Sequence, residues 1–244
     1  RFGRAGELFA QADPNALDTV IASMVAGGVT WSPTLSIYEA SRDVVRAQNL
    51  PWYRDYLHPS MEAFWTPDPD RHGSYFAGWT SSNEAAWRRN YRIWMDALER
   101  FGRLGGLITT GDDAGYIYSL YGFGLIREME LQEEAGFHPL EVVKHATVNG
   151  AELLGMADRL GRMRVGYIAD LLVVNGNPLE NLRILNPYGT SISVDGRSVH
   201  GGGIEWTIKD GIPYHVPTLM TEVRQMVDDA RGAAHSDTSA GRPE

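Results

Sequence analysis

The 244-residue chain contains no cysteine, which excludes a disulfide framework and a thiolate metal site. No apolar run approaches the roughly 20 residues that a membrane-spanning helix requires, so we expect no membrane partner. Lys and Arg number 22 against 31 Asp and Glu, and no basic stripe accompanies the net charge of -9, so nucleic acid is not expected as a partner either.

The chain also lacks a conventional start. It begins with Arg1 rather than Met, and residues 1–12 show no signal-peptide pattern. We expect that the chain starts inside a domain. A targeting segment could precede it, so the localisation stays unknown.

Strand and helix patterns alternate from residue 13 to residue 154, which predicts a parallel sheet with crossover helices. One helix starts at Asp13-Pro14, where a capping Asp precedes a Pro in the first turn. Another follows a capping box that Ser81 and Glu84 are expected to form. The other predicted elements are strands at residues 29–35 and 107–110 and helices at residues 123–135 and 139–154.

Three of these helices carry apolar residues at spacings of three and four, which predicts one buried face on each. Such a face packs against the rest of the domain. The residues predicted to be buried are Leu17, Val20, Ile21, Met24 and Val25; Trp87, Tyr91, Trp94, Leu98 and Phe101; and Leu140, Val143, Ala146, Leu153 and Leu154.

Residues 50–82 interrupt the alternation and are rich in proline and aromatic residues. A loop of this length in a compact domain is usually a lid or disordered, and the aromatic residues favour order. We expect an ordered excursion from which His72 could approach a substrate, although a surface histidine is the simpler interpretation.

The composition changes after Gly155, where short apolar runs separated by turn residues predict an antiparallel β patch. A helix is predicted at residues 217–231, and the small polar residues at 232–244 are expected to be disordered. The predicted strands are residues 167–174, 191–194, 204–209 and 212–215.

An acidic pair, Asp112 and Asp113, directly follows the predicted strand at residues 107–110. Barrel enzymes keep their chemistry at the carboxyl ends of parallel strands. A carboxylate suits such a place because it can bind a metal ion and accept a proton from the same position. The alternative is an ordinary turn with a capping Asp.

These elements, in this order and spacing, resemble the C-terminal half of the amidohydrolase superfamily, in its imidazolonepropionase-like and prolidase-like branch. The resemblance covers about residues 10–230. Each matching segment alone is a weak pattern, but their order and spacing together are specific. The matching segments are VTWSPTL (29–35), TGDDAG (110–115), EAGFHPLEVV (134–143), ATVNGAELLG (146–155), VGYIADLLVV (165–174), NPL (177–179) and IKDG (208–211).

The resemblance implies an α/β fold, the C-terminal part of a TIM-like (β/α)8 barrel followed by a small β-sandwich domain. In that fold residues 29–35 would be barrel strand seven and residues 107–110 strand eight. The implied parts are 1–157 for the barrel, with the aromatic insertion at 50–82, 158–216 for a composite β-sandwich, 217–231 for a C-terminal helix and 232–244 for the tail.

The resemblance also implies a metal-dependent hydrolase that activates water to cleave a C–N amide bond, or a related ester or lactam, in a small-molecule substrate. It assigns the catalytic and metal-binding carboxylate of strand eight to Asp113, and Asp112 stays open as the alternative ligand. The metal would be zinc, in a site of one or two ions. The family's His-x-His pair, bridging lysine and further histidines have no counterpart in this chain, so a missing N-terminal half or a partner chain would supply them.

Three tyrosines are candidates for substrate binding. Tyr116 and Tyr118 follow the acidic pair, and Tyr38 follows the predicted strand at residues 29–35. Both places would lie on the active face of a barrel, and packing of the rings at a domain edge carries equal weight. The substrate itself is not predicted, because barrel loops set specificity.

A second hypothesis is a non-catalytic half-barrel, an interaction module or remnant. An open half-barrel exposes sheet edges and an apolar face. It would need the missing half, a partner chain or a second copy of itself to cover them.

Overall fold

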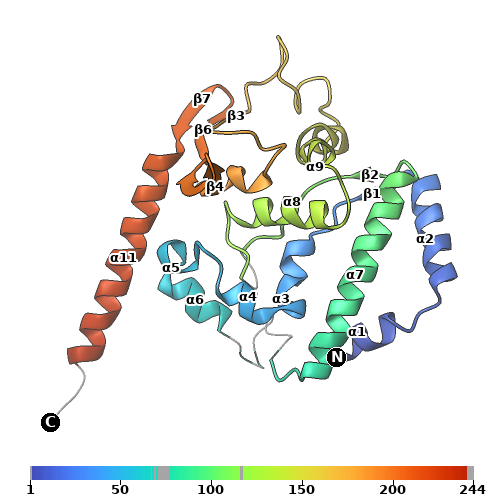
Figure 1. Cartoon of the computed structure of the whole chain (residues 1–244), viewed down its shortest axis with the longest axis horizontal. Coiled ribbons are helices and arrows are strands. Elements are labelled where there is room, and N and C mark those ends of the chain that lie inside the picture. Colours follow the sequence, from blue (N-terminus) through green and yellow to red (C-terminus); the bar gives the residue numbers. More distant parts are fainter. Residues whose placement is uncertain (1, 67, 69, 71–76, 116–117, 241–244) are drawn as a thin grey trace.

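The computed structural model describes residues 2–66, 68, 70, 77–115 and 118–240 (Figure 1). Within these ranges no helix has the length and apolar character required to cross a membrane.

The first part of the chain contains two short parallel strands, each preceded by a helix. β1 (Thr30–Trp31) pairs with β2 (Leu107–Ile108) in parallel. The helix α2 (Pro14–Ala26) precedes β1, and the helix α7 (Ser81–Arg103) precedes β2. The predicted alternation of helices with parallel strands is therefore confirmed.

Both strands are shorter than predicted. β1 stops before Pro33, which has no N–H to donate to a ladder, and Thr34 adopts a left-handed backbone with a φ of 47°. The chain then forms the 3₁₀ helix η1 (Leu35–Tyr38). Beyond β2 the Thr109 N–H still donates to the Trp31 carbonyl oxygen at 3.1 Å, and a loop begins there.

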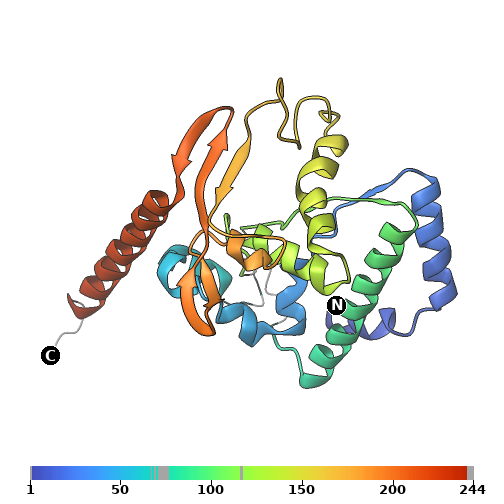
Figure 2. The same cartoon turned by 45° about the horizontal axis from the view of Figure 1, so that its top comes forward.

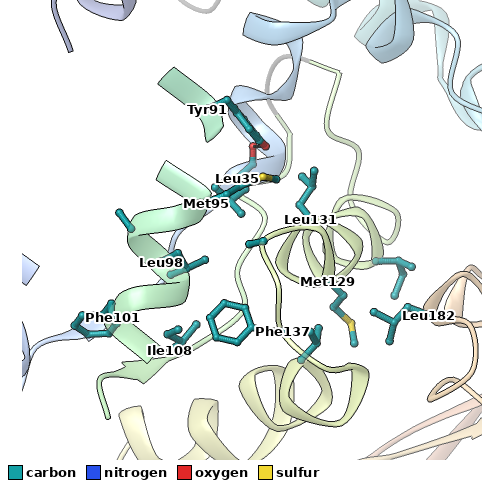
Figure 3. Packing of buried hydrophobic residues seen from close by; sticks show 14 of the residues in the cluster. Leu35, Tyr91, Met95, Leu98, Phe101, Ile108, Met129, Leu131, Phe137 and Leu182 are labelled. Carbon is teal, nitrogen blue, oxygen red and sulfur yellow. Dashed lines mark hydrogen bonds between the residues drawn. The ribbon is translucent and has the colours of Figure 1, made fainter. Parts of the chain in front are cut away.

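The helix α7 packs against α1 (Phe2–Phe9) and α2 (Figure 1). Its predicted apolar face is confirmed, since Trp87, Tyr91, Leu98 and Phe101 are buried and Trp94 is partly buried. Figure 3 shows part of this face meeting the apolar side chains of β2 and of the helix α8 (Gly124–Glu134).

The predicted buried face of α2 is only partly confirmed. Ile21 is buried, and Leu17, Met24 and Val25 pack partly buried against the main core. Val20 is exposed, because no described element covers its side of the helix.

The predicted helices at residues 123–135 and 139–154 are present. They are α8 (Gly124–Glu134) and then α9 (Pro139–Lys144), which continues through the π turn η2 (His145–Asn149) into α10 (Gly150–Leu153). The predicted inward face of the second helix is partly wrong. Val143 and Ala146 contact the core, whereas Leu140, Leu153 and Leu154 are exposed.

Helix geometry accounts for the exposure of Leu140 and Leu153. Leu140 is two positions from the fully buried Val142 and so lies on the opposite side of α9. A π turn inserts one residue, which rotates the positions after it by about 100°. The π turn therefore rotates Leu153 away from the side of Val142; Ala151 is buried, and Leu154 is exposed at the end of the helix.

The described residues between 39 and 66 form short helices rather than a loop. These helices are α3 (Glu39–Arg42), α4 (Val44–Gln48), α5 (Tyr53–Tyr56) and α6 (Pro59–Trp65). Their aromatic rings build a second core with Tyr118 and Phe123; the rings of Trp52 and Phe123, for example, stack with centroids 5.1 Å apart. The aromatic residues of this region thus order it, as expected, as far as it is described.

The chain after residue 158 forms two antiparallel sheets (Figure 2). The 3₁₀ helix η3 (Leu182–Leu185) lies between β3 and β4 in the sequence. One sheet has the order β3-β6-β7 and the other is the hairpin β4-β5, which confirms the antiparallel patch. Among the described residues the two sheets stay separate, so the β-sandwich remains a prediction. The strands are β3 (Leu171–Val174), β4 (Thr190–Val194), β5 (Arg197–Gly201), β6 (Ile204–Lys209) and β7 (Ile212–His215).

Two features of this region differ from the sequence prediction. The strand β5 is additional, and it follows an Asp195-Gly196 turn in which both residues have positive φ, 51° and 74°. The helix α11 (Val216–Ala240) extends beyond the predicted end at residue 231, into residues predicted to be disordered. Alanine at positions 233 and 234 favours this extension. Residues 241–244 lie outside the described part.

The cap of α7 also differs from the prediction, because Thr80 rather than Ser81 is the N-cap. The Thr80 side chain accepts from the Asn83 N–H at 3.3 Å, and Asn83 Oδ1 accepts from the Thr80 N–H at 3.0 Å. Glu84 instead pairs with Arg88 at 3.9 Å. The capping box is therefore shifted by one residue from the predicted one.

We predict that Thr80→Ala lowers the free energy of unfolding by about 1 kcal/mol, because it removes the acceptor for the Asn83 N–H. Ser81→Ala is the matched control and should change it by less than about 0.5 kcal/mol. Urea denaturation of both variants measures the difference. A larger loss of unfolding free energy in the Ser81 variant would instead support Ser81 as the N-cap, as predicted from the sequence.

Candidate active site

The loops that follow β1 and β2 meet at the same edge of the two-stranded sheet. Ser36 Oγ, in η1, donates to the carbonyl oxygen of Asp112 at 3.1 Å. The loops also approach closely at Gly111, where a Cβ would lie 3.0 Å from Ser32 Oγ. Parallel pairing therefore brings the acidic pair beside residues that precede it by more than 70 positions.

The carboxylate of Asp112 is turned into its own loop. It is half-buried and accepts hydrogen bonds from the N–H groups of Asp112 and Ala114. Burial raises the pKa of Asp112, and these two N–H groups partly offset the rise. A Cβ on Gly124 would lie 2.4 Å from Asp112 Oδ2, so glycine at the start of α8 leaves room for this carboxylate. Asp112 thus makes the turn contacts that a capping Asp makes.

The carboxylate of Asp113 faces away from these contacts. The residue is exposed, and among the described residues no hydrogen bond or ion pair to its side chain is found. Its φ of 50° lies in the left-handed region, which is uncommon for residues other than glycine and which Asp tolerates better than most. Of the two aspartates, Asp113 is the one with free acceptor oxygens. Its role as a ligand remains a prediction that this contrast supports.

The candidate tyrosines differ in their surroundings. Tyr118 is buried in the second core, where its hydroxyl accepts from Gln48 Nε2 at 2.9 Å, so its position fits packing better than substrate contact. Tyr38 is partly exposed, and its ring meets Trp94 edge-on at 5.4 Å. Tyr116 and His72 lie outside the described residues. Tyr121 is highly exposed, and its hydroxyl would lie 2.6 Å from a Cβ on Gly115, close to the acidic pair.

Beneath the acidic loop lies a buried polar chain that the sequence analysis missed. Glu128 and Gln132 of α8 are fully buried, and His145 of the π turn is 7% exposed. Gln132 Oε1 lies 2.9 Å from His145 Nδ1 and 3.3 Å from Thr110 Oγ1, and Gln132 Nε2 donates to Glu128 Oε1 at 3.4 Å. The sequence signal is weak: Glu128 and Gln132 are four positions apart and so share one face of α8, but this helix also carries Arg127, Glu130, Glu133 and Glu134.

Burial shifts the pKa values of Glu128 and His145 in opposite directions. It raises the pKa of Glu128 to about 7, although the N–H groups of Ser36 and Leu35 donate to this carboxylate. It lowers the pKa of His145 to about 4, so the ring is neutral at pH 7 and donates from Nδ1 to Gln132.

The described residues do not form a complete metal site. Within them no group of three or more His, Cys, Asp or Glu side chains is arranged to hold an ion. The carboxylate of Asp113 fits the role of a single oxygen ligand for zinc, and such a site needs further donors.

Comparison with solved structures defines the fold class as part of a TIM-barrel-like α/β fold. A Xaa-Pro dipeptidase with bound methionine superposes with a TM-score of 0.51 at 21% identity, over 84% of this chain and 38% of that chain. A prolidase in complex with N-methylphosphonate-L-proline superposes with a TM-score of 0.52 at 21% identity, over 81% of this chain and 37% of that chain. At this identity the likeness shows the fold alone.

Part of the sequence matches a known family. Residues 81–199, which include the acidic pair, match the amidohydrolase family, and the resemblance inferred from the sequence is thereby confirmed. An ochratoxinase from Aspergillus niger is 40% identical over 60 residues, which are 23% of this chain and 12% of that protein. The chain thus spans less than two-fifths of the length of the relatives that it matches.

We predict that His145 makes the chain less stable at pH 5 than at pH 7. Its pKa is about 4 in the folded chain against a usual value of 6.5, so the unfolded chain binds more protons between these pH values. The stabilisation present above pH 6.5 is therefore lost as the pH falls toward 4. His145→Asn does not titrate and can keep an N–H donor toward Gln132.

The comparison is urea denaturation of both proteins at pH 7 and pH 5. The decrease in unfolding free energy from pH 7 to pH 5 should be about 1–2 kcal/mol larger in the wild type than in His145→Asn. Equal losses would show that the buried histidine does not control the acid sensitivity.

Proposed function

We propose that this chain is the C-terminal part of a metal-dependent hydrolase of the amidohydrolase type, which uses water to cleave a C–N amide bond or a related ester or lactam. One observation carries the proposal: Asp113 presents an exposed carboxylate, without a described partner, at the carboxyl edge of two parallel strands. The family match over residues 81–199 supports the reaction class. The active face of a barrel lies at this edge.

Asp113 is proposed as both metal ligand and proton acceptor. A divalent ion, most simply zinc as one or two ions, supplies Lewis acidity toward water and the scissile carbonyl when bound. The Asp113 carboxylate orients the water, accepts its proton at a carboxylate oxygen and passes it to the leaving nitrogen or oxygen. Asp112 holds the loop through its own backbone contacts instead.

The remaining ligands are proposed to come from polypeptide outside these 244 residues, as an N-terminal half or a partner chain. The lengths of the relatives support this, and so do apolar side chains that the described part leaves exposed, such as Val29, Leu104 and Leu154. We propose that the same polypeptide completes the β-sandwich begun by residues 158–216, while residues 1–157 belong to the barrel.

The first test compares this chain with a longer protein that also contains the polypeptide encoded upstream of Arg1. The 244-residue chain should bind zinc weakly, because a lone carboxylate is a poor site. The longer protein should retain zinc in stoichiometric amounts, measured by metal analysis after dialysis. Tight stoichiometric zinc binding by the 244-residue chain alone would contradict the proposed division of ligands.

The second test uses the longer protein and separates the two aspartates. Asp113→Asn should lower kcat/KM by about 100-fold or more, because it removes the proton acceptor. Asp112→Asn is the matched control and should lower it far less, since Asn can keep the backbone contacts of the turn. A larger loss in the Asp112 variant would transfer the role to that residue.

The exposed apolar side chains also favour a second candidate, a non-catalytic half-barrel that binds a partner or a second copy of itself. Light scattering coupled to size-exclusion chromatography, with metal analysis of the same fractions, distinguishes the two. A stable metal-free homodimer that gains neither metal nor activity from the upstream polypeptide would support the module and contradict the hydrolase.

A further inference from the structure

Glu128 connects α8 to the loop after β1. Its Oε2 accepts from the Ser36 N–H at 2.7 Å, and the Leu35 N–H also donates to this carboxylate. Ser36 Oγ lies 3.1 Å from the carbonyl oxygen of Asp112, to which it donates. A fixed path of hydrogen bonds thus runs from the buried carboxylate to the residue before Asp113.

Gln132 connects α8 to the other end of the same loop. One turn after Glu128, its Nε2 donates to the carbonyl oxygen of Thr109 at 3.2 Å, and its Oε1 accepts from Thr110 Oγ1 at 3.3 Å. His145 fixes the orientation of the Gln132 amide through its Nδ1. The segment between β2 and Asp113 is therefore held from both sides by two neighbouring side chains of one helix.

Stability of the core does not explain why a carboxylate, rather than an apolar side chain, is at position 128. Burial of an ionisable group costs free energy that an apolar side chain would not. No ion pair with a Lys or Arg compensates Glu128 among the described residues; its contacts there are amide groups. Contacts of this kind fix directions and distances, which apolar packing does less strictly.

We propose that Glu128 is a positioning residue: acting through Ser36 and Gln132, it holds the loop after β2 so that the Asp113 carboxylate points out of the loop toward the metal. This inference rests on the proposed function of Asp113. The backbone of Asp113 is in the left-handed region, with a φ of 50°, and a loosened loop would relax from it. Because Asp113 acts on the reacting water, loss of its position lowers kcat more than it raises KM.

The first measurement is hydrogen exchange by mass spectrometry in the 244-residue chain. Glu128→Ala should speed exchange by about tenfold or more in peptides covering residues 35–38 and 109–114, while α7 keeps its protection. Glu133→Ala, at an exposed position of the same helix, is the control and should leave both peptides unchanged. Unchanged exchange at residues 109–114 in Glu128→Ala would overturn the coupling.

The second measurement uses the longer, metal-loaded protein. Glu128→Ala should lower metal affinity and kcat by about 10–100-fold, as loss of a residue that orients a ligand does, with a smaller change in KM. Glu128→Gln should restore part of the loss, because it keeps one acceptor oxygen but turns an NH₂ group toward N–H donors. Glu133→Ala should match the wild type.

Two further variants make each outcome decisive. If Glu128→Ala does not fold, Ser36→Ala removes the hydrogen bond from the Ser36 hydroxyl to the Asp112 carbonyl oxygen and should give a smaller loss of the same kind. If Asp113→Asn impairs the enzyme while Glu128→Ala and Ser36→Ala do not, the positioning role is overturned and the proposed function stands. If Asp113→Asn itself keeps full metal affinity and kcat, the proposed function fails and the positioning role fails with it.

Discussion

The hydrogen bonds that converge on Ser36 are the constraint on which the candidate site depends. The parallel pairing of β1 with β2 is only two residues long on each strand, so it cannot by itself fix the loops that follow. Ser36 extends the connection beyond the strands, with its N–H on Glu128 and its hydroxyl on the Asp112 carbonyl oxygen. Without this connection, the loop that carries the two aspartates would be held only at its start, where Gln132 bonds to Thr109 and Thr110.

This constraint also separates two adjacent aspartates that look equivalent in the sequence. The backbone carbonyl oxygen of Asp112 accepts from the Ser36 hydroxyl, and its carboxylate accepts from N–H groups of its own loop. Its polar groups are therefore already engaged. Asp113 follows in a left-handed conformation that directs its side chain elsewhere. One residue provides the turn and the next is available for chemistry, and both features need the glycine at position 124 and the tie to η1.

Local patterns in the sequence predict the longer helices and the parallel strands, because these depend on spacing within a few residues, but they miss α1 and the short helices α3 to α6. Caps and faces are less predictable. Thr80 and Ser81 are both suitable caps, and the backbone geometry decides between them. An unrecognised π turn misplaces Leu153. Glu128 resembles an exposed helix residue in the sequence, since its partner Ser36 lies 92 positions away. Contacts between residues distant in the sequence, such as this one, hold the candidate site in place.

The central claim is that Asp113 binds a divalent ion whose other donors come from outside these 244 residues. Anomalous diffraction from a zinc-loaded crystal of the longer protein tests it most directly. The account predicts a zinc peak about 2.0–2.2 Å from a carboxylate oxygen of Asp113, with Asp112 still bonded to its own loop. A zinc ion bound elsewhere, with Asp113 oxygens far from it or occupied by backbone N–H groups, would contradict the account.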